Sequence, residues 1–110
     1  MTIPNAENAV VDVAKLTDYC LNRDHPRGRH KARVFAAALG LNVENAADLQ
    51  AALLHAVSEE PATITIRDEF GQRYVVDFTM EGPAGTARVR SSWIIRTEED
   101  FRRLTSCYVL

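Results

Sequence analysis

The sequence has few cysteines and no long apolar run, and each shortage excludes a class of protein. Its 110 residues include only Cys20 and Cys107, too few for a small secreted scaffold built on disulfides. The sequence leaves open whether these two form a bridge. No stretch approaches the roughly 20 apolar residues of a membrane-spanning helix, and the opening MTIPNAENAVVDVAK lacks the pattern of a secretory signal. We therefore expect a cytoplasmic protein that does not enter a membrane.

The sequence also lacks an excess of positive charge. With 13 basic and 15 acidic residues its net charge is −2, which argues against a general role in packaging nucleic acid. One window, residues 23–33, departs from this balance. Its charged members are Arg23, Asp24, Arg27, Arg29, Lys31 and Arg33. This basic window is either a binding surface or the solvated start of a helix with its preceding turn.

The first part of the chain predicts short, irregular elements. We expect residues 1–8 to be loose, and residues 9–14 to form a short strand or to begin a helix. Residues 15–21 predict a short helical segment. The following NRDHPRG is a loop, because Pro26 restricts the residue before it to extended geometry.

Two longer helices are predicted next. The first covers residues 29–39 and ends at Gly40. The segment LNVENAADLQAALLHAVSEEP predicts the second, with Asn45 as its N-cap and Asp48 in a capping-box position. Its apolar residues recur at helical spacing, and Pro61 ends it.

After residue 61 the period of the apolar residues changes from 3.6 to 2, which predicts strands. Isoleucine and threonine alternate in TITI, and Tyr74, Val76 and Phe78 share one face of RYVVDFTM. TARVRSSWIIR and LTSCYVL predict two further strands. The last strand could lie at an edge or in the middle of the sheet, and its apolar content on both faces favours the middle.

Short turns, DEFGQ, EGPAG and TEED, join these strands and favour an antiparallel meander. We predict an α+β fold, with two to three N-terminal helices packed on one face of a four-stranded, mainly antiparallel meander sheet. Residues 1–110 are expected to form a single domain, mainly helical over 9–60 and sheet over 61–110.

The helix predicted over residues 29–39 contains a lysine on its apolar side. Four apolar residues fall within about 80° of Lys31 on a helical wheel: Val34, Phe35, Ala38 and Leu39. A buried ammonium needs partners or a lowered pKa. Lys31 therefore either snorkels to water or projects into a cleft between helix and sheet. In a cleft it could hold a phosphate or stabilise a transition state.

Histidine is the usual acid–base group near neutral pH, and the chain has three. His30 could line the rim of the same cleft or simply face solvent. Structural roles are predicted for His25, which could brace the turn before Pro26, and for His55, late in the second long helix. The histidines and cysteines show none of the common ligand spacings, so we predict no metal and no cofactor.

Side chains on the predicted strands are further candidates. They are Arg73, Arg88, Arg90, Arg96, Thr105, Ser106 and Tyr108. The arginines either contact a substrate or pair with acidic residues on the solvent face of the sheet. Arg88 and Arg90 share a face unless a bulge at Ser91 and Ser92 intervenes. The only tryptophan, Trp93, is predicted to lie in the core.

Several segments resemble a family of small uncharacterised bacterial domains: NRDHPRGRHKARVFAAALG, DEFGQRYVVDF, SSWIIR and LTSCYVL. The family pattern includes Gly-x-x-Lys-Ala-x-x-Phe-x-x-x-Leu-Gly, a Tyr-Gly-x-x-Tyr hairpin and a Trp-Ile strand, and the resemblance covers residues 15–110. The sequence is similar also to C-terminal toxin domains of contact-dependent and polymorphic toxin systems. Those toxins resemble, remotely, the ribonuclease superfamily of barnase, EndoU, colicin and RelE-like proteins.

The resemblance assigns family positions to Lys31, Phe35, Trp93 and Thr105. The chain departs from the pattern at Arg23, where the loop often has proline, and at Phe70, where the hairpin has tyrosine. A histidine at position 30 is not a fixed feature of the toxin relatives. The resemblance implies a toxin-like ribonuclease acting on RNA and restrained by a cognate immunity or antitoxin protein.

Metal-independent RNA cleavage needs a group that takes the 2′-hydroxyl proton, a cation beside the phosphorane and an acid for the leaving oxygen. We predict as catalytic residues Lys31, His30 and Thr105. We predict as substrate-binding residues Arg29, Arg73, Arg88 and Tyr108. The alternatives are a non-catalytic interaction module that binds an adjacent-gene product, and an inactive relative of the toxin fold.

Overall fold

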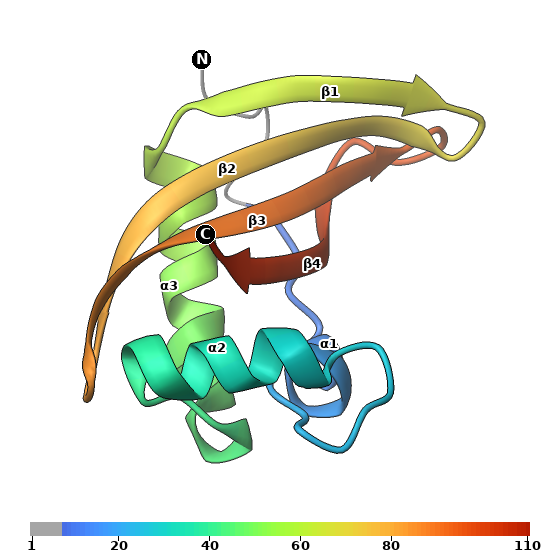
Figure 1. Cartoon of the computed structure of the whole chain (residues 1–110). Coiled ribbons are helices and arrows are strands. Elements are labelled where there is room, and N and C mark those ends of the chain that lie inside the picture. The colour runs from blue at the N-terminus through green and yellow to red at the C-terminus, as the bar shows by residue number, and fades with distance from the viewer. Residues whose placement is uncertain (1–7) are drawn as a thin grey trace.

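The computed structural model describes residues 8–110 as a four-stranded sheet with its helices on one face (Figure 1). The helical elements are α1 (Val13–Lys15), the π-helix η2 (Leu16–Cys20), α2 (Arg29–Leu39), the 3₁₀ turn η3 (Val43–Asn45) and α3 (Ala46–Glu59). The strands are β1 (Ala62–Asp68), β2 (Gly71–Gly82), β3 (Gly85–Arg96) and β4 (Arg102–Val109). The sheet order is β1-β2-β3-β4 with every neighbouring pair antiparallel, which confirms the predicted α+β meander.

The segment before α1 makes one strand-like contact. Val10 pairs with Arg103 as a single parallel bridge, and its N–H donates to the Arg102 carbonyl at 2.7 Å. A helix then begins at Val13, so each of the two alternatives predicted for residues 9–14 occurs in part. The loose segment expected at the N-terminus lies, except for residue 8, outside the described residues.

β4 lies at an edge of the sheet, which of the two positions left open is the one that its apolar content did not favour. The bridge with Val10 covers the start of its outer edge, and η2 and α2 contact β4 as well. Helices and an extended segment thus take the place of a fifth strand. This cover explains why an edge strand is apolar on both faces and why Leu104 and Cys107 are buried.

The helix-facing side of the sheet carries the core. Tyr74, Val76 and Phe78 are buried, as their alternation predicts, and Trp93 is fully buried in the neighbouring strand. The Trp93 indole N–H donates to Ser91 Oγ at 2.8 Å, and Ser91 Oγ donates to the Val76 carbonyl at 2.7 Å. These bonds satisfy the buried polar atoms of β3, so the core prediction for Trp93 is confirmed.

α2 presents a different face to the core from the one predicted. Its buried residues are Ala32, Phe35 and Leu39, while Val34 is 44% exposed. The covered face is therefore turned toward Ala32, and Lys31 lies at its border and not at its centre. The helix ends, as predicted, at Gly40, whose φ of 71° is a left-handed conformation that favours glycine.

Asn45 is the N-cap residue of α3, as predicted, but its side chain makes no cap hydrogen bond to that helix. Asn42 Oδ1 accepts from the Glu44 N–H at 2.9 Å, and Asn45 Oδ1 accepts from the Asn42 N–H at 3.0 Å. The capping box therefore lies one turn before the predicted Asn45 and Asp48 pair. This capping box caps the N-terminus of η3, and η3 leads directly into α3.

β4 contains a β-bulge. Ser92 pairs with Ser106 and Trp93 pairs with Leu104, so Thr105 is an extra residue on β4. Thr105 Oγ1 donates to the Ser92 carbonyl at 3.1 Å. A bulge was considered at Ser91 and Ser92 on β3. The bulge lies opposite Ser92, and its inserted residue is on β4. A bulge breaks simple alternation and re-aims the side chains around it.

Candidate functional site

Lys31 is the centre of a polar cluster between the start of α2 and β4. Its Nζ donates to Ser106 Oγ at 3.1 Å and to Tyr19 Oη at 3.3 Å. The ammonium also lies 4.9 Å from the Tyr19 ring centroid and 5.7 Å from that of Tyr108. Among residues 8–110, no carboxylate forms an ion pair with it. Two of its three N–H groups are used, which leaves one for a bound anion.

The cysteines lie on the inner side of this cluster. The neighbouring Cys107 and, less strongly, the Ser106 hydroxyl and the Lys31 ammonium favour the anion of Cys20. Together they lower the pKa of Cys20 to about 6, although burial opposes the change. The neighbouring Cys20 and its own burial raise the pKa of Cys107. Both cysteines are free thiols.

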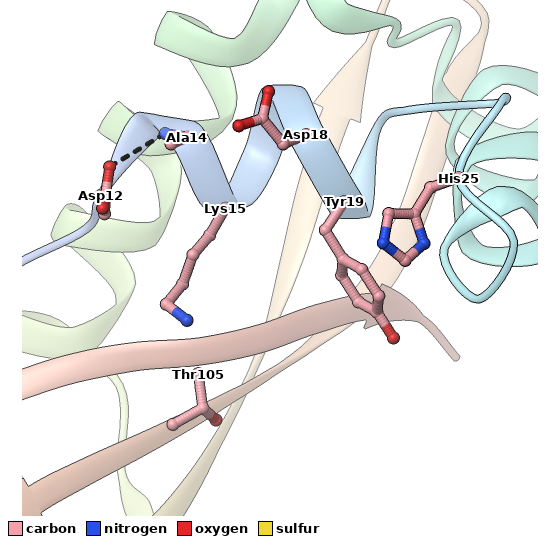
Figure 2. A pocket seen from close by; sticks show the side chains of 7 residues that line it. All are labelled: Asp12, Ala14, Lys15, Asp18, Tyr19, His25 and Thr105. Atoms are coloured by element: carbon pink, nitrogen blue, oxygen red, sulfur yellow. Dashed lines mark hydrogen bonds between the residues drawn. The ribbon is translucent and has the colours of Figure 1, made fainter.

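A pocket of about 520 Å³ opens beside the Lys31 cluster (Figure 2). Its walls are formed by Asp12, Ala14, Lys15, Asp18, Tyr19, His25 and Thr105. In Figure 2 the Tyr19 ring and the His25 imidazole lie side by side. Tyr19 both lines the pocket and contacts Lys31, which is not itself among the residues of the pocket wall.

His25 is held by the backbone of its own turn. Its Nδ1 accepts from the N–H groups of Arg27 and Gly28, both at 3.0 Å, which confirms the predicted bracing role. Its ring also packs edge-on against Tyr19, with 4.8 Å between centroids. Since Nδ1 is an acceptor, the neutral ring carries its proton on Nε2 and can donate it to a ligand in the pocket.

An ion pair fixes the strand beside Tyr108. Arg90 pairs with Tyr108 across β3 and β4, and donates two hydrogen bonds of 2.8 Å to the Asp77 carboxylate. The bonds to Arg90 hold the pKa of Asp77 below its ordinary value. This ion pair therefore fixes the side chain of Arg90, which is the cross-strand neighbour of Tyr108 in the Lys31 cluster.

We expect this ion pair to make stability depend on pH in the acid range. Asp77 has a lower pKa folded than unfolded, so its contribution is present above about pH 4 and is lost as pH falls through the folded value. The thermal midpoint of Asp77→Asn should therefore vary less than that of the wild type between about pH 5 and pH 2. Glu81→Gln, an exposed change on the same strand, is the control, and equal slopes for all three proteins would contradict the expectation.

The structure brings three of the predicted site residues together. Lys31 and Tyr108 belong to the same cluster, and Thr105 lines the adjoining pocket. Arg29 and His30 are exposed at the start of α2, and within residues 8–110 their side chains form no hydrogen bond or ion pair. They lie in the basic window but outside the walls of the pocket.

The predicted strand arginines have contacts elsewhere. Arg73 donates to Asp68 at 2.9 Å, and Arg88 donates to Thr79 Oγ1 at 3.1 Å. The Arg73 bond fits the alternative interpretation, in which strand arginines pair with acidic residues on the solvent face, whereas Arg88 bonds to a threonine. Their substrate-binding role stays a prediction without a contact to the Lys31 cluster.

Sequence reasoning missed Tyr19 and Ser106 as partners of Lys31, and His25 and Lys15 as pocket residues. Tyr19 lies in a π-helix, and Ser106 follows the bulge residue, so regular periodicity misplaces both. The sequence signal that could have indicated Ser106 as a partner of Lys31 is the run of hydroxyl-bearing side chains on the last strand.

The described part of the chain offers no ready metal site. Within residues 8–110, no group of three or more His, Cys, Asp or Glu side chains could hold a metal ion. Nor is any helix there long and apolar enough to cross a membrane.

Comparison with known proteins identifies a family and a solved structure of similar fold. Residues 2–110 match the family described as "Domain of unknown function (DUF6883)". No curated protein matches the sequence. The fold is similar to a chain from the solved "Contact-dependent growth inhibition toxin - immunity protein complex from Klebsiella pneumoniae 342", with a TM-score of 0.68 and 16% identity. The match covers 92% of this chain and 99% of that one, and at this identity the likeness is one of fold.

Proposed function

This chain belongs to the DUF6883 family, and we propose that it is a single toxin-like domain that cleaves RNA in the cytoplasm without a metal ion. The observation that carries the proposal is the Lys31 ammonium, half-buried, unpaired with any described carboxylate and with one N–H left for an anion. The fold shared with a chain of a toxin–immunity complex supports a toxin-like role.

Lys31 stabilises the negative charge that develops on the phosphorane when the 2′-hydroxyl attacks the phosphate. Thr105 and the His25 Nε2–H lie on the adjoining pocket walls and donate hydrogen bonds to phosphate oxygens. His30 stays the predicted group for proton transfer, because it is exposed one residue before Lys31. The aromatic rings of Tyr19 and Tyr108 offer surfaces on which bases stack.

The test is cleavage of a single-stranded RNA and of the same sequence in 2′-deoxy form by the purified protein. We expect the RNA to be cut in the presence of a chelator, the deoxy strand to stay intact, and the products to end in a 2′,3′-cyclic phosphate. Induced expression in bacteria should stop growth and fragment total RNA. Intact RNA in both settings would contradict the proposal.

The second candidate is a non-catalytic interaction module, and β1 is the observation that favours it. β1 forms the other edge of the sheet, and only Ala62 in it is buried. Ile64 and Ile66 are 52% and 64% exposed, and Phe70 in the adjoining turn is 62% exposed. An exposed edge with apolar side chains suits pairing with a strand of a partner, such as an immunity protein. Growth arrest on expression without that partner fits only the first candidate.

A further inference from the structure

Tyr19 is the residue at which the pocket and the Lys31 cluster meet. It lies on η2, and of the described residues it alone both lines the pocket wall and hydrogen-bonds to Lys31. Its ring packs against the His25 imidazole with 4.8 Å between centroids, and its Oη lies 3.3 Å from Lys31 Nζ. The side chain is therefore held both at the ring and at the hydroxyl oxygen.

The hydrogen of the Tyr19 hydroxyl is free for a ligand. A lysine ammonium has three N–H donors and no lone pair, so Tyr19 Oη must be the acceptor of its bond with Lys31. The phenol hydrogen therefore points elsewhere, and within residues 8–110 no acceptor receives it. Because Tyr19 lines the pocket, this hydrogen is available to a molecule that is bound there.

The other hydroxyl groups beside the site are less suited to giving up a proton. Thr105 Oγ1 directs its hydrogen to the Ser92 carbonyl at 3.1 Å, and Ser106 is not among the residues of the pocket wall. Threonine and serine are also aliphatic alcohols, whereas the phenol of tyrosine is a far stronger acid. Thr105 can therefore turn to bind a ligand oxygen, but Tyr19 is the hydroxyl that can protonate one.

We propose that Tyr19 is the general acid of RNA cleavage and donates its Oη proton to the 5′ oxygen that leaves the phosphate. This inference rests on the proposed function. Such cleavage uses a base and an acid in the same step, and His30 can be only one of them. Lys31 supports the acid, because an ammonium 3.3 Å from Oη stabilises the negative charge that this oxygen gains when its proton departs.

The step balances in bonds and protons. The 2′ oxygen forms a bond to phosphorus while its proton passes to the base, for which His30 is the predicted group. The P–O bond to the 5′ oxygen breaks, its electron pair stays on that oxygen, and the oxygen takes the proton from Tyr19 Oη. The products are a 2′,3′-cyclic phosphate, a 5′-hydroxyl end and a tyrosinate beside Lys31. Water then returns a proton to Tyr19 and accepts one from the protonated base.

A purely structural role for Tyr19 predicts a different pattern of effects. In that role the hydroxyl only holds Lys31 in place, so its loss slows every reaction that needs the ammonium. A general acid, in contrast, is needed only where the leaving atom must be protonated. A sulfur atom at the 5′ position leaves as a thiolate without a proton, because thiols are much stronger acids than alcohols. A substrate with this sulfur therefore separates the two roles.

The experiment uses two short strands, each with a single ribonucleotide in a deoxy sequence, which differ in having oxygen or sulfur at the 5′ position of the scissile bond. In single turnovers we expect Tyr19→Phe to cut the oxygen strand about 10²–10⁴-fold more slowly than the wild type does. The variant should cut the sulfur strand within about threefold of the wild-type rate. Tyr74→Phe removes the same atom from a buried tyrosine outside the pocket wall, and should leave both rates unchanged.

Equal slowing of both strands by Tyr19→Phe, or slowing of neither, would overturn the acid role. If circular dichroism shows that this variant does not fold, 3-fluorotyrosine at position 19 keeps the hydroxyl and gives a second measurement. Fluorine makes a phenol more acidic, so the fall in rate at alkaline pH should begin at lower pH than in the wild type, and an unmoved profile would overturn the role. Wild-type protein that cuts neither strand would contradict the proposed function itself, whereas every other outcome is obtained with an active wild type.

Discussion

Replacing Lys31 with alanine is expected to lower the rate of RNA cleavage by about 10²–10⁴-fold, with the fold retained. The change removes the one described ammonium that faces Ser106, Tyr19 and Tyr108 together. Stability should change little, because the side chain lies at the border of the buried face of α2 and takes part in no ion pair. The measurement is the single-turnover cleavage rate, beside the circular dichroism spectrum.

Arg33→Ala is the matched control for this change. Arg33 lies on the same helix and in the same basic window, but it is exposed. We expect less than a threefold effect on cleavage from its loss, as for a surface charge remote from the site. Lys31→Arg keeps the charge and should retain part of the activity, although its planar group cannot reproduce both short bonds. Equal rates for Lys31→Ala and the wild type would remove Lys31 from the reaction.

Gly28→Ala is expected to destabilise the protein by about 2–4 kcal/mol and to lower RNA cleavage as well. A Cβ at position 28 would lie 2.2 Å from the Tyr19 carbonyl oxygen, a backbone atom that cannot move alone. The φ of Gly28 is −87°, which alanine adopts readily, so the cost comes from the clash and not from strain. Relief of the clash must shift η2, and with it the Tyr19 ring beside Lys31.

Urea unfolding gives the free energy of unfolding, and Arg29→Ala is the neighbouring control. Arg29 is exposed, and its replacement should change that free energy by no more than about 0.5 kcal/mol. If Gly28→Ala is as stable as the control, the close approach of the turn to η2 does not hold in solution. If it is destabilised but fully active at low temperature, Tyr19 does not take part in the site.

Local rules predicted the elements of this fold well, since each rests on neighbouring residues. The helix over residues 29–39, the change of period after residue 61 and the short turns fixed the α+β meander. The sequence could not decide between an edge and a middle position for β4, because apolar content reports burial and does not report which element provides it. Here Val10 and the helices cover the strand.

The candidate site was predictable only in part. Lys31 is visible in the sequence because an ammonium interrupts an apolar face, and that signal is local. Its partners Tyr19 and Ser106 depend on a π-helix and on a one-residue bulge. Each irregularity shifts a side chain by a fraction of a turn or to another face, and neither has a composition signal. Regular periodicity therefore locates Lys31 but does not identify Tyr19 and Ser106, the residues that hydrogen-bond to it.

The late place of β4 in the chain has a consequence for synthesis. The hydroxyl and aromatic groups that surround Lys31 on β4, Thr105, Ser106 and Tyr108, are translated about 75 residues after it. The helices and the first hairpins can form while the chain is still tethered, because their contacts are local. A nascent chain that stops before Arg102 lacks every β4 partner of Lys31. Assembly of the site thus waits for β4, and products truncated before this strand carry the basic window without the site.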